Sequence, residues 1–143
     1  MATSVRMSRE AMDRIVDDHF AYEARADLEG VMGTYTENPT HYVVGGPDGP
    51  LTGKPAIRGF YERLFPDLRG ERAENVMRVH EDNLIVDETL LIGKVVDGRP
   101  FGLPGLRGDD VRVRLLHIFT LRDERIESEK VWFDADELRR QLR

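Results

Sequence analysis

The sequence has no cysteine among its 143 residues, which excludes disulfide bonds, thiolate metal ligands and a thiol nucleophile. Long apolar runs are also missing, because no uncharged stretch reaches the roughly 18 residues that a membrane-spanning helix needs. The first residues, MATSVRMSRE, lack the apolar segment of a secretory signal. We therefore expect a cytoplasmic protein with no membrane partner.

An excess of positive charge is absent as well. The chain has 21 Lys and Arg against 27 Asp and Glu, a formal net charge of −6, and no basic block that could follow a phosphate backbone. We expect no nucleic-acid partner. The length and the 40% of hydrophobic residues suit one domain with its own core. We assign residues 1–7 to a flexible N-terminus and residues 8–143 to a single domain.

Two helices are predicted at the start of this domain. Ser8 is a suitable N-cap for a helix over SREAMDRIVDDHFAYEARA, in which apolar residues recur at spacings of three and four. Asp27 is a suitable cap for a second, shorter helix, whose apolar stripe ends at Tyr35. The segment ENP then ends the helical pattern.

A short strand and a third helix follow. The run from His41 to Val44 is β-prone, and GGPDGP after it is a turn-rich loop. Pro55 stands where a first-turn proline is tolerated, and the helix there is expected to stop at Pro66.

The second half of the chain has the character of strands. Residues 74–80, 84–92, 111–121 and 126–133 are rich in β-branched and large apolar residues, and alternation is clearest in VRVRLLHIFTL. We predict antiparallel strands here, a long functional loop over GKVVDGRPFGLPGLRGDD, and a closing helix capped by Asp134. Helices followed by a curved antiparallel sheet make an α+β domain, and such a sheet encloses a space suited to a ligand.

Three segments carry a resemblance to a known family: HFAYEARADLEGVMGTYTENPTHY, GPLTGKPAIRGFYERLF and HIFTLRDERIESEKVWFD. The chain resembles the SnoaL-like polyketide cyclases, in the superfamily that also holds ketosteroid isomerases, limonene epoxide hydrolases, scytalone dehydratases and nuclear transport factor two. The resemblance implies a cone-shaped barrel, in which a curved antiparallel sheet wraps around N-terminal helices and a short C-terminal helix follows. It does not fix a reaction, because the superfamily includes several enzyme classes and non-enzymes.

The resemblance also implies a polar set in the pocket. His19 falls where the ketosteroid isomerases have their oxyanion-binding Tyr, His117 where they have a protonated Asp, and Tyr61 on their supporting Tyr. Val44 falls on the position of their catalytic base, and a valine cannot move a proton. The isomerase mechanism itself is therefore not supported.

The epoxide-hydrolase mechanism meets a similar objection. That family activates water with an Arg and two Asp, and the alignment puts Thr89, Leu91 and Val131 at those places. These replacements argue against the same chemistry here, although a shift of one residue in strand register would change the assignment.

His117 is the strongest catalytic candidate from its own surroundings. It alternates with apolar residues in strand 111–121, and burial there favours the neutral imidazole that can accept a proton. The alternative is a core histidine hydrogen-bonded to a backbone carbonyl or to Tyr61. His19 lies on the apolar face of the first helix, with Glu23 one turn later to orient it. A metal held by His19, Glu23 and His117 has no ligand-spacing motif behind it, so we expect neither metal nor cofactor.

Further side chains are expected to contact a substrate, and most of them are apolar or aromatic. His41, on the strand face opposite Tyr42, and His80 are expected at the surface. The predicted substrate-contacting residues are Glu23, Tyr42, Val44, Phe60, Phe119 and Trp132.

Two kinds of function stay open. The first is a cofactor-independent acid–base enzyme of cyclase, isomerase or dehydratase type, acting on an apolar carbonyl-bearing compound with His117 as acid or base and His19 as electrophilic partner. The alternative is a non-catalytic ligand-binding or dimeric interaction domain of the same fold. The resemblance implies a homodimer through the outer face of the sheet, where Arg112 and Arg114 alternate with apolar residues.

Overall fold

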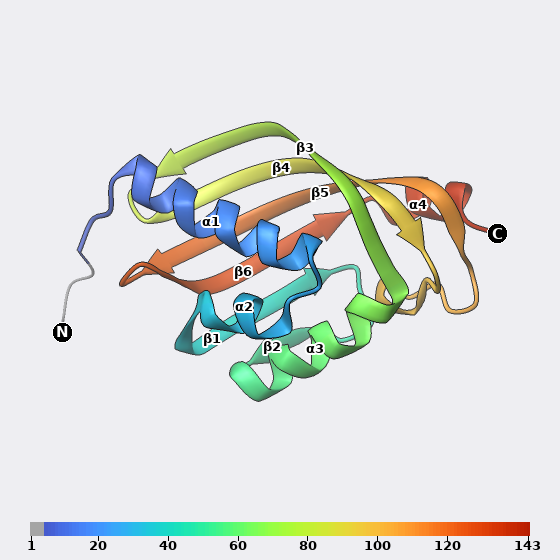
Figure 1. The fold of residues 1–143 in the computed structure, drawn as a ribbon, viewed down its shortest axis with the longest axis horizontal. Helices are drawn as coiled ribbons and strands as arrows, with labels where there is room; N and C mark the ends of the chain where they lie inside the picture. The colour runs from blue at the N-terminus through green and yellow to red at the C-terminus, as the bar shows by residue number, and fades with distance from the viewer. Residues whose placement is uncertain (1–4) are drawn as a thin grey trace.

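The computed structural model describes residues 5–143 and shows helices covering the concave face of one curved sheet (Figure 1). The helices are α1 (Arg9–Ala24), α2 (Leu28–Gly33), α3 (Lys54–Asp67) and α4 (Ala135–Gln141), with a 3₁₀ turn, η1, at Arg99–Phe101. The strands are β1 (Tyr35–Val44), β2 (Pro50–Thr52), β3 (Leu68–Glu81), β4 (Leu84–Val95), β5 (Gly108–Arg122) and β6 (Arg125–Phe133).

The sheet confirms the α+β class but differs from an antiparallel barrel in two respects. Its strand order is β2-β1-β6-β5-β4-β3, so β2 and β3 are open edges and the sheet does not close on itself. Every neighbouring pair is antiparallel except β1 and β6, which run parallel. The parallel pair arises because a long connection through α3 and four strands separates β1 from β6 in the chain.

The three predicted helix caps are confirmed. The Ser8 hydroxyl accepts a hydrogen bond from the Ala11 N–H at 3.1 Å. The carboxylates of Asp27 and Asp134 accept from backbone N–H groups three residues later, at 2.9 and 3.1 Å. Each cap satisfies a donor that the first helical turn leaves free, and so fixes where its helix begins.

Two predicted element ends were wrong. Tyr35, expected to end the stripe of the second helix, begins β1, where it pairs with Ile126. The ENP segment lies within β1 and is accommodated by a register shift between Tyr35 and Thr40. Helix α3 passes Pro66 and ends at Asp67, because the Leu68 N–H still reaches the Leu64 carbonyl.

The first described residues contact the rest of the fold. Residues 1–4 of the predicted flexible segment lie outside the described residues. The Met7 N–H donates to the Asn83 side-chain oxygen at 2.9 Å, and the Asn83 amide donates to the Val5 carbonyl at 2.9 Å. Met7 also packs against the main core cluster, so residues 5–7 contribute both hydrogen bonds and apolar contacts.

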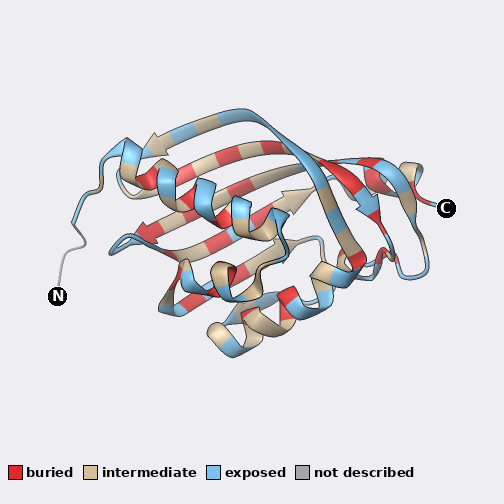
Figure 2. Ribbon diagram, in the orientation of Figure 1, coloured by how far each residue is buried: buried red, intermediate tan, exposed pale blue. Residues whose placement is uncertain are grey.

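Buried side chains concentrate on the concave face of the sheet and on the helix faces toward it, whereas β3 is largely exposed (Figure 2). A second, smaller cluster lies near α4 and the C-terminus. Within the described residues, no helix has both the length and the apolar character needed to cross a bilayer. The main cluster between the helices and the sheet includes Met12, Val16, Ile57, Tyr61, Phe119 and Ile126.

Strands β3 and β4 come unusually close where β3 bends. Gly93 in β4 pairs with Gly70, and the register shifts between Gly70 and Arg72. A Cβ atom on Gly93 would lie 2.1 Å from the backbone oxygen of Arg69, so a larger residue requires the two strands to move apart. This close contact lies beside the register shift of β3.

We therefore expect Gly93→Ala to lower the free energy of unfolding by about 1–3 kcal/mol, the usual cost of overpacking. The matched control is Gly33→Ala at the end of α2, where the new Cβ meets nothing within 4 Å, so stability should be unchanged or slightly raised. Urea unfolding of both variants measures the difference. Equal stability of the two variants would show that the close approach does not constrain the sheet.

Candidate functional site

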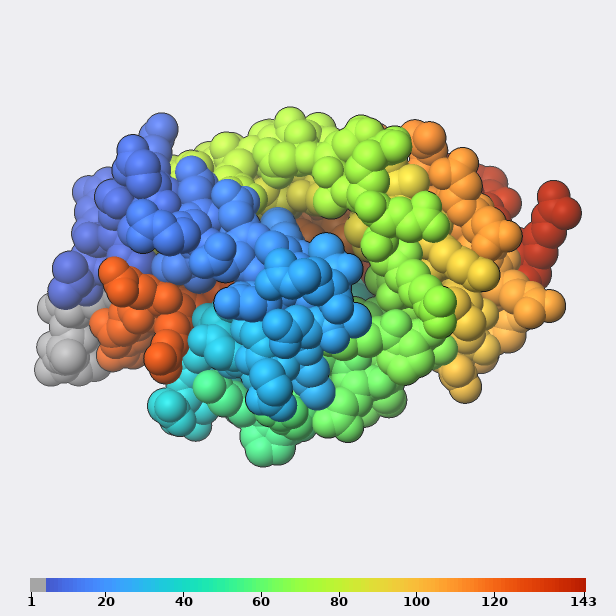
Figure 3. Space-filling view, in the orientation of Figure 1, coloured from blue at the N-terminus to red at the C-terminus, as the bar shows by residue number. Residues whose placement is uncertain are grey.

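A cavity of about 250 Å³ lies between α1, α3 and the concave face of the sheet. The space-filling view is hollowed between the blue of α1 and the green of β3, with orange strand atoms visible inside (Figure 3). Most of the wall is apolar or aromatic. The polar side chains that line the cavity are Glu23, His41, Tyr61, Glu71, Arg72, Thr89, His117 and Glu129.

Four of the sequence-predicted site residues line this cavity: His117, Tyr61, Glu23 and Phe60. His117 projects from β5 on the apolar face that the alternation predicted, and its pairing partner on β6 is Val131. His19 is 0% exposed and lies behind the lining. The structure thus brings His19, Glu23, Tyr61 and His117 to one region, with His19 in its second layer.

The other predicted substrate contacts do not line the cavity. Phe119 is fully buried in the core beside it. Both β1 and β6 present their odd-numbered residues to the cavity. The side chains of Tyr42, Val44 and Trp132, each one residue away, therefore lie on the other face of the sheet. A one-residue slip turns a side chain to the other face of the sheet. The residues that occupy the expected places are His41, Val43, Val131 and Phe133.

The two histidines expected at the surface are covered. His41 is 2% exposed and lines the cavity, for the same reason of register. His80 keeps 14% of its side chain exposed, and its Nε2 lies 2.7 Å from a carboxylate oxygen of Asp13. Arg78 on the same strand also turns inward, where it contacts the buried carboxylate of Asp87 at 2.8 Å.

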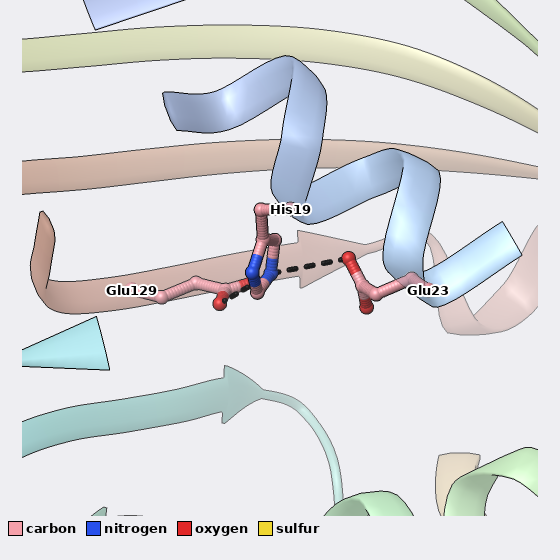
Figure 4. Close-up of side chains that lie close together, drawn as sticks. All are labelled: His19, Glu23 and Glu129. Atoms are coloured by element: carbon pink, nitrogen blue, oxygen red, sulfur yellow. Dashed lines mark ion pairs between the residues drawn. The ribbon is translucent and has the colours of Figure 1, made fainter. Parts of the chain in front are cut away.

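Glu129, which sequence reasoning missed, is the centre of the polar cluster. Its side chain is 2% exposed and projects from β6. The Oε1 atom accepts a hydrogen bond from the Tyr35 hydroxyl at 2.6 Å and lies 3.2 Å from Nε2 of His19 (Figure 4). The Oε2 atom lies 3.9 Å from Nε2 of His117. One carboxylate therefore connects α1, β1, β5 and β6.

The hydrogen bonds of His19 require both ring nitrogens to be protonated. The Thr34 hydroxyl donates to the Val31 carbonyl at 2.6 Å, so it accepts from Nδ1 of His19 at 2.9 Å. Nε2 lies 3.2 Å from a carboxylate oxygen of Glu23 and 3.2 Å from one of Glu129. Because each nitrogen faces an acceptor, the ring is an imidazolium.

The electrostatics of the cluster agree with this assignment. Burial disfavours the charged ring of His19, but the carboxylates of Glu23 and Glu129 outweigh burial and raise the His19 pKa from 6.5 to about 10. Burial likewise opposes ionisation of Glu129, but the charge and hydrogen bond of His19 hold the pKa of that carboxyl far below its usual range. The result is a buried ion pair whose partners stabilise each other.

Two buried tyrosines, Tyr35 and Tyr61, complete the hydrogen-bonded cluster around Glu129. Because the Tyr35 hydroxyl gives its proton to Glu129, the Tyr61 hydroxyl donates to Tyr35 at 3.0 Å. The Tyr61 oxygen also lies 3.4 Å from Nε2 of His19. Burial, followed by the nearby Glu129 charge, raises the pKa of both phenols. Tyr61 thus lines the cavity with its proton already committed to a neighbour.

His41 and His117 are neutral imidazoles beside this charged pair. Burial lowers the pKa of both rings, and the carboxylate of Glu129 opposes that effect only in part. Among the described residues, Nδ1 of each ring has no hydrogen-bond partner. His117 stacks on Phe119 with ring centroids 5.3 Å apart, and His41 lies 4.5 Å from the ring of Phe60. Both rings keep hydrogen-bonding capacity that the fold does not use.

A signal for Glu129 does exist in the sequence. In SEKVWF it alternates with Val131 and Phe133, and a carboxylate on the apolar face of a strand needs a buried partner. Tyr35 and Thr34 give no such signal, because their roles depend on how β1 approaches α1 in space.

The residue types in this cluster are also those that bind divalent cations. Ligand atoms of His19, Glu23 and Glu129 lie within 4.8 Å of one another. The possible metal ligands are therefore His19, Glu23 and Glu129, whereas the sequence analysis considered His117 in place of Glu129. The Nε2 proton of His19 occupies the position that faces both carboxylates, so any metal there competes with that proton.

The raised pKa of His19 predicts how stability depends on pH. A group whose pKa is higher in the folded than in the unfolded state stabilises fully below its unfolded value, and this stabilisation is lost as pH rises through the folded value. Between pH 6.5 and about 10, the wild-type protein should lose stability from this source. His19→Gln should be about 3–5 kcal/mol less stable near pH 6, with the gap narrowing toward pH 10.

Urea unfolding of both proteins at several pH values measures that gap. Val79→Gln, which changes an exposed and non-ionisable side chain of β3, is the control, and its gap from wild type should not narrow over the same alkaline range. A His19→Gln gap that stays constant from pH 6 to 10 would mean that His19 is not the group whose proton stabilises the fold.

The chain was compared with protein-family models, with curated proteins and with solved structures. The SnoaL-like domain family model matches residues 16–129. No match was found among curated proteins.

Three solved structures illustrate the likeness of fold. A putative isomerase from Bacillus subtilis is 18% identical, with a TM-score of 0.74 and coverage of 92% of each chain. A putative SnoaL-like polyketide cyclase from Shewanella denitrificans OS-217 is 15% identical, with a TM-score of 0.74 over 93% of this chain and 97% of that one. An LEH-like epoxide hydrolase from M. tuberculosis is 15% identical, with a TM-score of 0.70 over 93% and 90%. At these identities the likeness establishes the fold alone.

Proposed function

This chain belongs to the SnoaL-like domain family, and on that premise we propose that it is a cofactor-independent acid–base enzyme. It would be of cyclase, isomerase or dehydratase type and act on an apolar carbonyl-bearing compound. The observation that carries the proposal is the pairing of neutral His117 with ionised Glu129 in the wall of a largely apolar cavity. A carboxylate beside a histidine base supports the imidazolium that forms, and the 3.9 Å separation here is longer than a hydrogen bond.

His117 is the proposed proton acceptor. With its Nε2–H directed to Oε2 of Glu129, the lone pair of Nδ1 is free, and no described residue hydrogen-bonds to it. The ring takes a proton from the carbon beside the carbonyl, and the electron pair of that C–H bond forms the enolate. Glu129 stabilises the resulting imidazolium, which then returns the proton to another atom of the product.

His41 is the proposed donor to the enolate oxygen. It lines the cavity, is neutral because of burial, and has no partner at Nδ1. His19, for which the resemblance implied this role, has both nitrogens occupied by Thr34, Glu23 and Glu129. We propose that His19 and Tyr61 position Glu129, and that His19 also keeps its carboxylate ionised.

Water activation of the epoxide-hydrolase kind receives no support. Thr89, Leu91 and Val131, at the places implied for its Arg and two Asp, all line the cavity. None of the three has an ionisable side chain, so they cannot polarise an epoxide or deprotonate water.

The alternative is a ligand-binding domain without catalysis. It is favoured by the completeness of the inner hydrogen bonds, since Glu129, His19 and both tyrosines are satisfied without a ligand. We also propose a homodimer through the outer sheet face, where β3 leaves Met77 and Val79 at 42% and 50% exposure. A cytoplasmic location stays part of the proposal.

Hydrogen–deuterium exchange beside a carbonyl tests the proposed reaction without knowledge of the substrate. Apolar aryl ketones in D₂O should exchange their α-protons faster with the protein present. His117→Ala and Glu129→Gln should lower that rate by about 10²-fold or more, the usual effect of losing a positioned acid or base. NMR measures both the exchange and the binding of each ketone.

His80→Ala, altered outside the cavity, is the control and should exchange at the wild-type rate. Circular dichroism checks that each variant is folded. Ketones that bind without exchange would favour the non-catalytic alternative, and full exchange by folded His117→Ala would contradict the assigned base.

A further inference from the structure

The polar wall of the cavity has more negative than positive charge. Two carboxylates, those of Glu23 and Glu129, face one imidazolium, that of His19. Burial keeps His41 and His117 neutral, so they do not offset the second carboxylate. One negative charge therefore remains uncompensated beside an apolar space, where electrostatic interactions are stronger than in water.

The hydrogen bonds show which carboxylate has fewer donors. The Nε2–H group of His19 faces three acceptors: Glu23 Oε1 at 3.2 Å, Glu129 Oε1 at 3.2 Å and the Tyr61 oxygen at 3.4 Å. Glu129 also receives the Tyr35 hydroxyl at 2.6 Å. For Glu23, the shared His19 proton is the one donor found within residues 5–143.

Glu23 can also be reached from the cavity. It lines the cavity, and 24% of its side chain is exposed, against 2% for Glu129. Among the described lining residues, the Lys or Arg side chain is Arg72 on β3, whose guanidinium pairs with Glu74 at 3.2 Å and is 59% exposed. No protein cation in the described lining therefore occupies the position beside Glu23.

We propose that the ligand of this cavity carries a protonated amine, which binds the carboxylate of Glu23 while its apolar body fills the aromatic part of the cavity. The inference rests on the proposed function and adds the substrate class. Aromatic rings at Phe20, Phe60, Tyr61 and Phe65 line the same space, and such rings attract cations as well as apolar groups. Anionic compounds are disfavoured, because both carboxylates would repel them.

The geometry also limits how the amine lies relative to the reacting carbon. Ligand atoms of Glu23 and Glu129 are within 4.8 Å of each other, and Glu129 supports His117 at 3.9 Å. An ammonium group on Glu23 thus places a carbon a few bonds away near His117. The inferred substrate is an apolar amino ketone in which the two groups lie close together.

Three compounds of similar shape test the inference: phenethylamine, 2-phenylethanol and 3-phenylpropionate. Binding is measured by NMR titration at pH 7 in the presence of EDTA, so that no metal bridges ligand and protein. The amine should bind at least tenfold more tightly than the alcohol, and the carboxylate most weakly. Glu23→Gln should reduce the preference for the amine over the alcohol to about one, while affinity for the alcohol stays unchanged.

Two variants serve as controls. Glu10→Gln removes the same charge from an exposed position of α1 and should keep the preference. Glu23→Asp keeps the charge and should retain most of the preference for the amine, which separates the effect of charge from damage to the fold. An alcohol that binds as tightly as the amine, or an unchanged preference in folded Glu23→Gln, overturns the inference.

The failure of this inference and that of the proposed function can be told apart. If ketones undergo exchange but the amine is not preferred, the substrate class is wrong and the proposed function stands. If the amine is preferred but no ketone is exchanged, the Glu23 site stands and the catalytic assignment fails. If no compound of either set binds, both are overturned.

Discussion

The buried pair of His19 and Glu129 is the interaction on which the rest of the site depends. A carboxylate at 2% exposure costs several kcal/mol to ionise unless a partner compensates, and His19 supplies that partner at 3.2 Å. Thr34 fixes the ring of His19 from one side, and Tyr35 fixes Glu129 from another. The first helix, the first strand and the last strand are thereby tied together at one point inside the fold.

The titratable groups of the site are of two kinds: the charged pair of His19 and Glu129, and the neutral rings of His41 and His117. Burial keeps the other two histidines near this pair neutral, and the charge of His19 adds to that effect. Among the described residues, Nδ1 of each of these rings has no hydrogen-bond partner. The imidazolium of His19 thus lies behind the cavity, whereas Glu129 and the two neutral histidines lie in its wall.

The sequence predicted the class of fold, the three helix caps and the inward face of His117, because each depends on local spacing. Errors arose where a distant segment decides the outcome. His41 and Val43 face the cavity because β1 pairs with β6, some ninety residues later, and the expectation for Tyr42 and Val44 was therefore wrong by one residue. Glu129 had a local signal, but its partners Tyr35 and Thr34 become neighbours only when the sheet forms.

The protonation states of the histidine rings can be measured by nitrogen-15 NMR, and they show directly whether His19 and Glu129 form a buried ion pair. If they do, both nitrogens of His19 are protonated at pH 7, and its signals change only near pH 10. His41 and His117 should each carry one ring proton at pH 7. A neutral His19 at pH 7, or protonated rings at His41 and His117, would contradict the central claim.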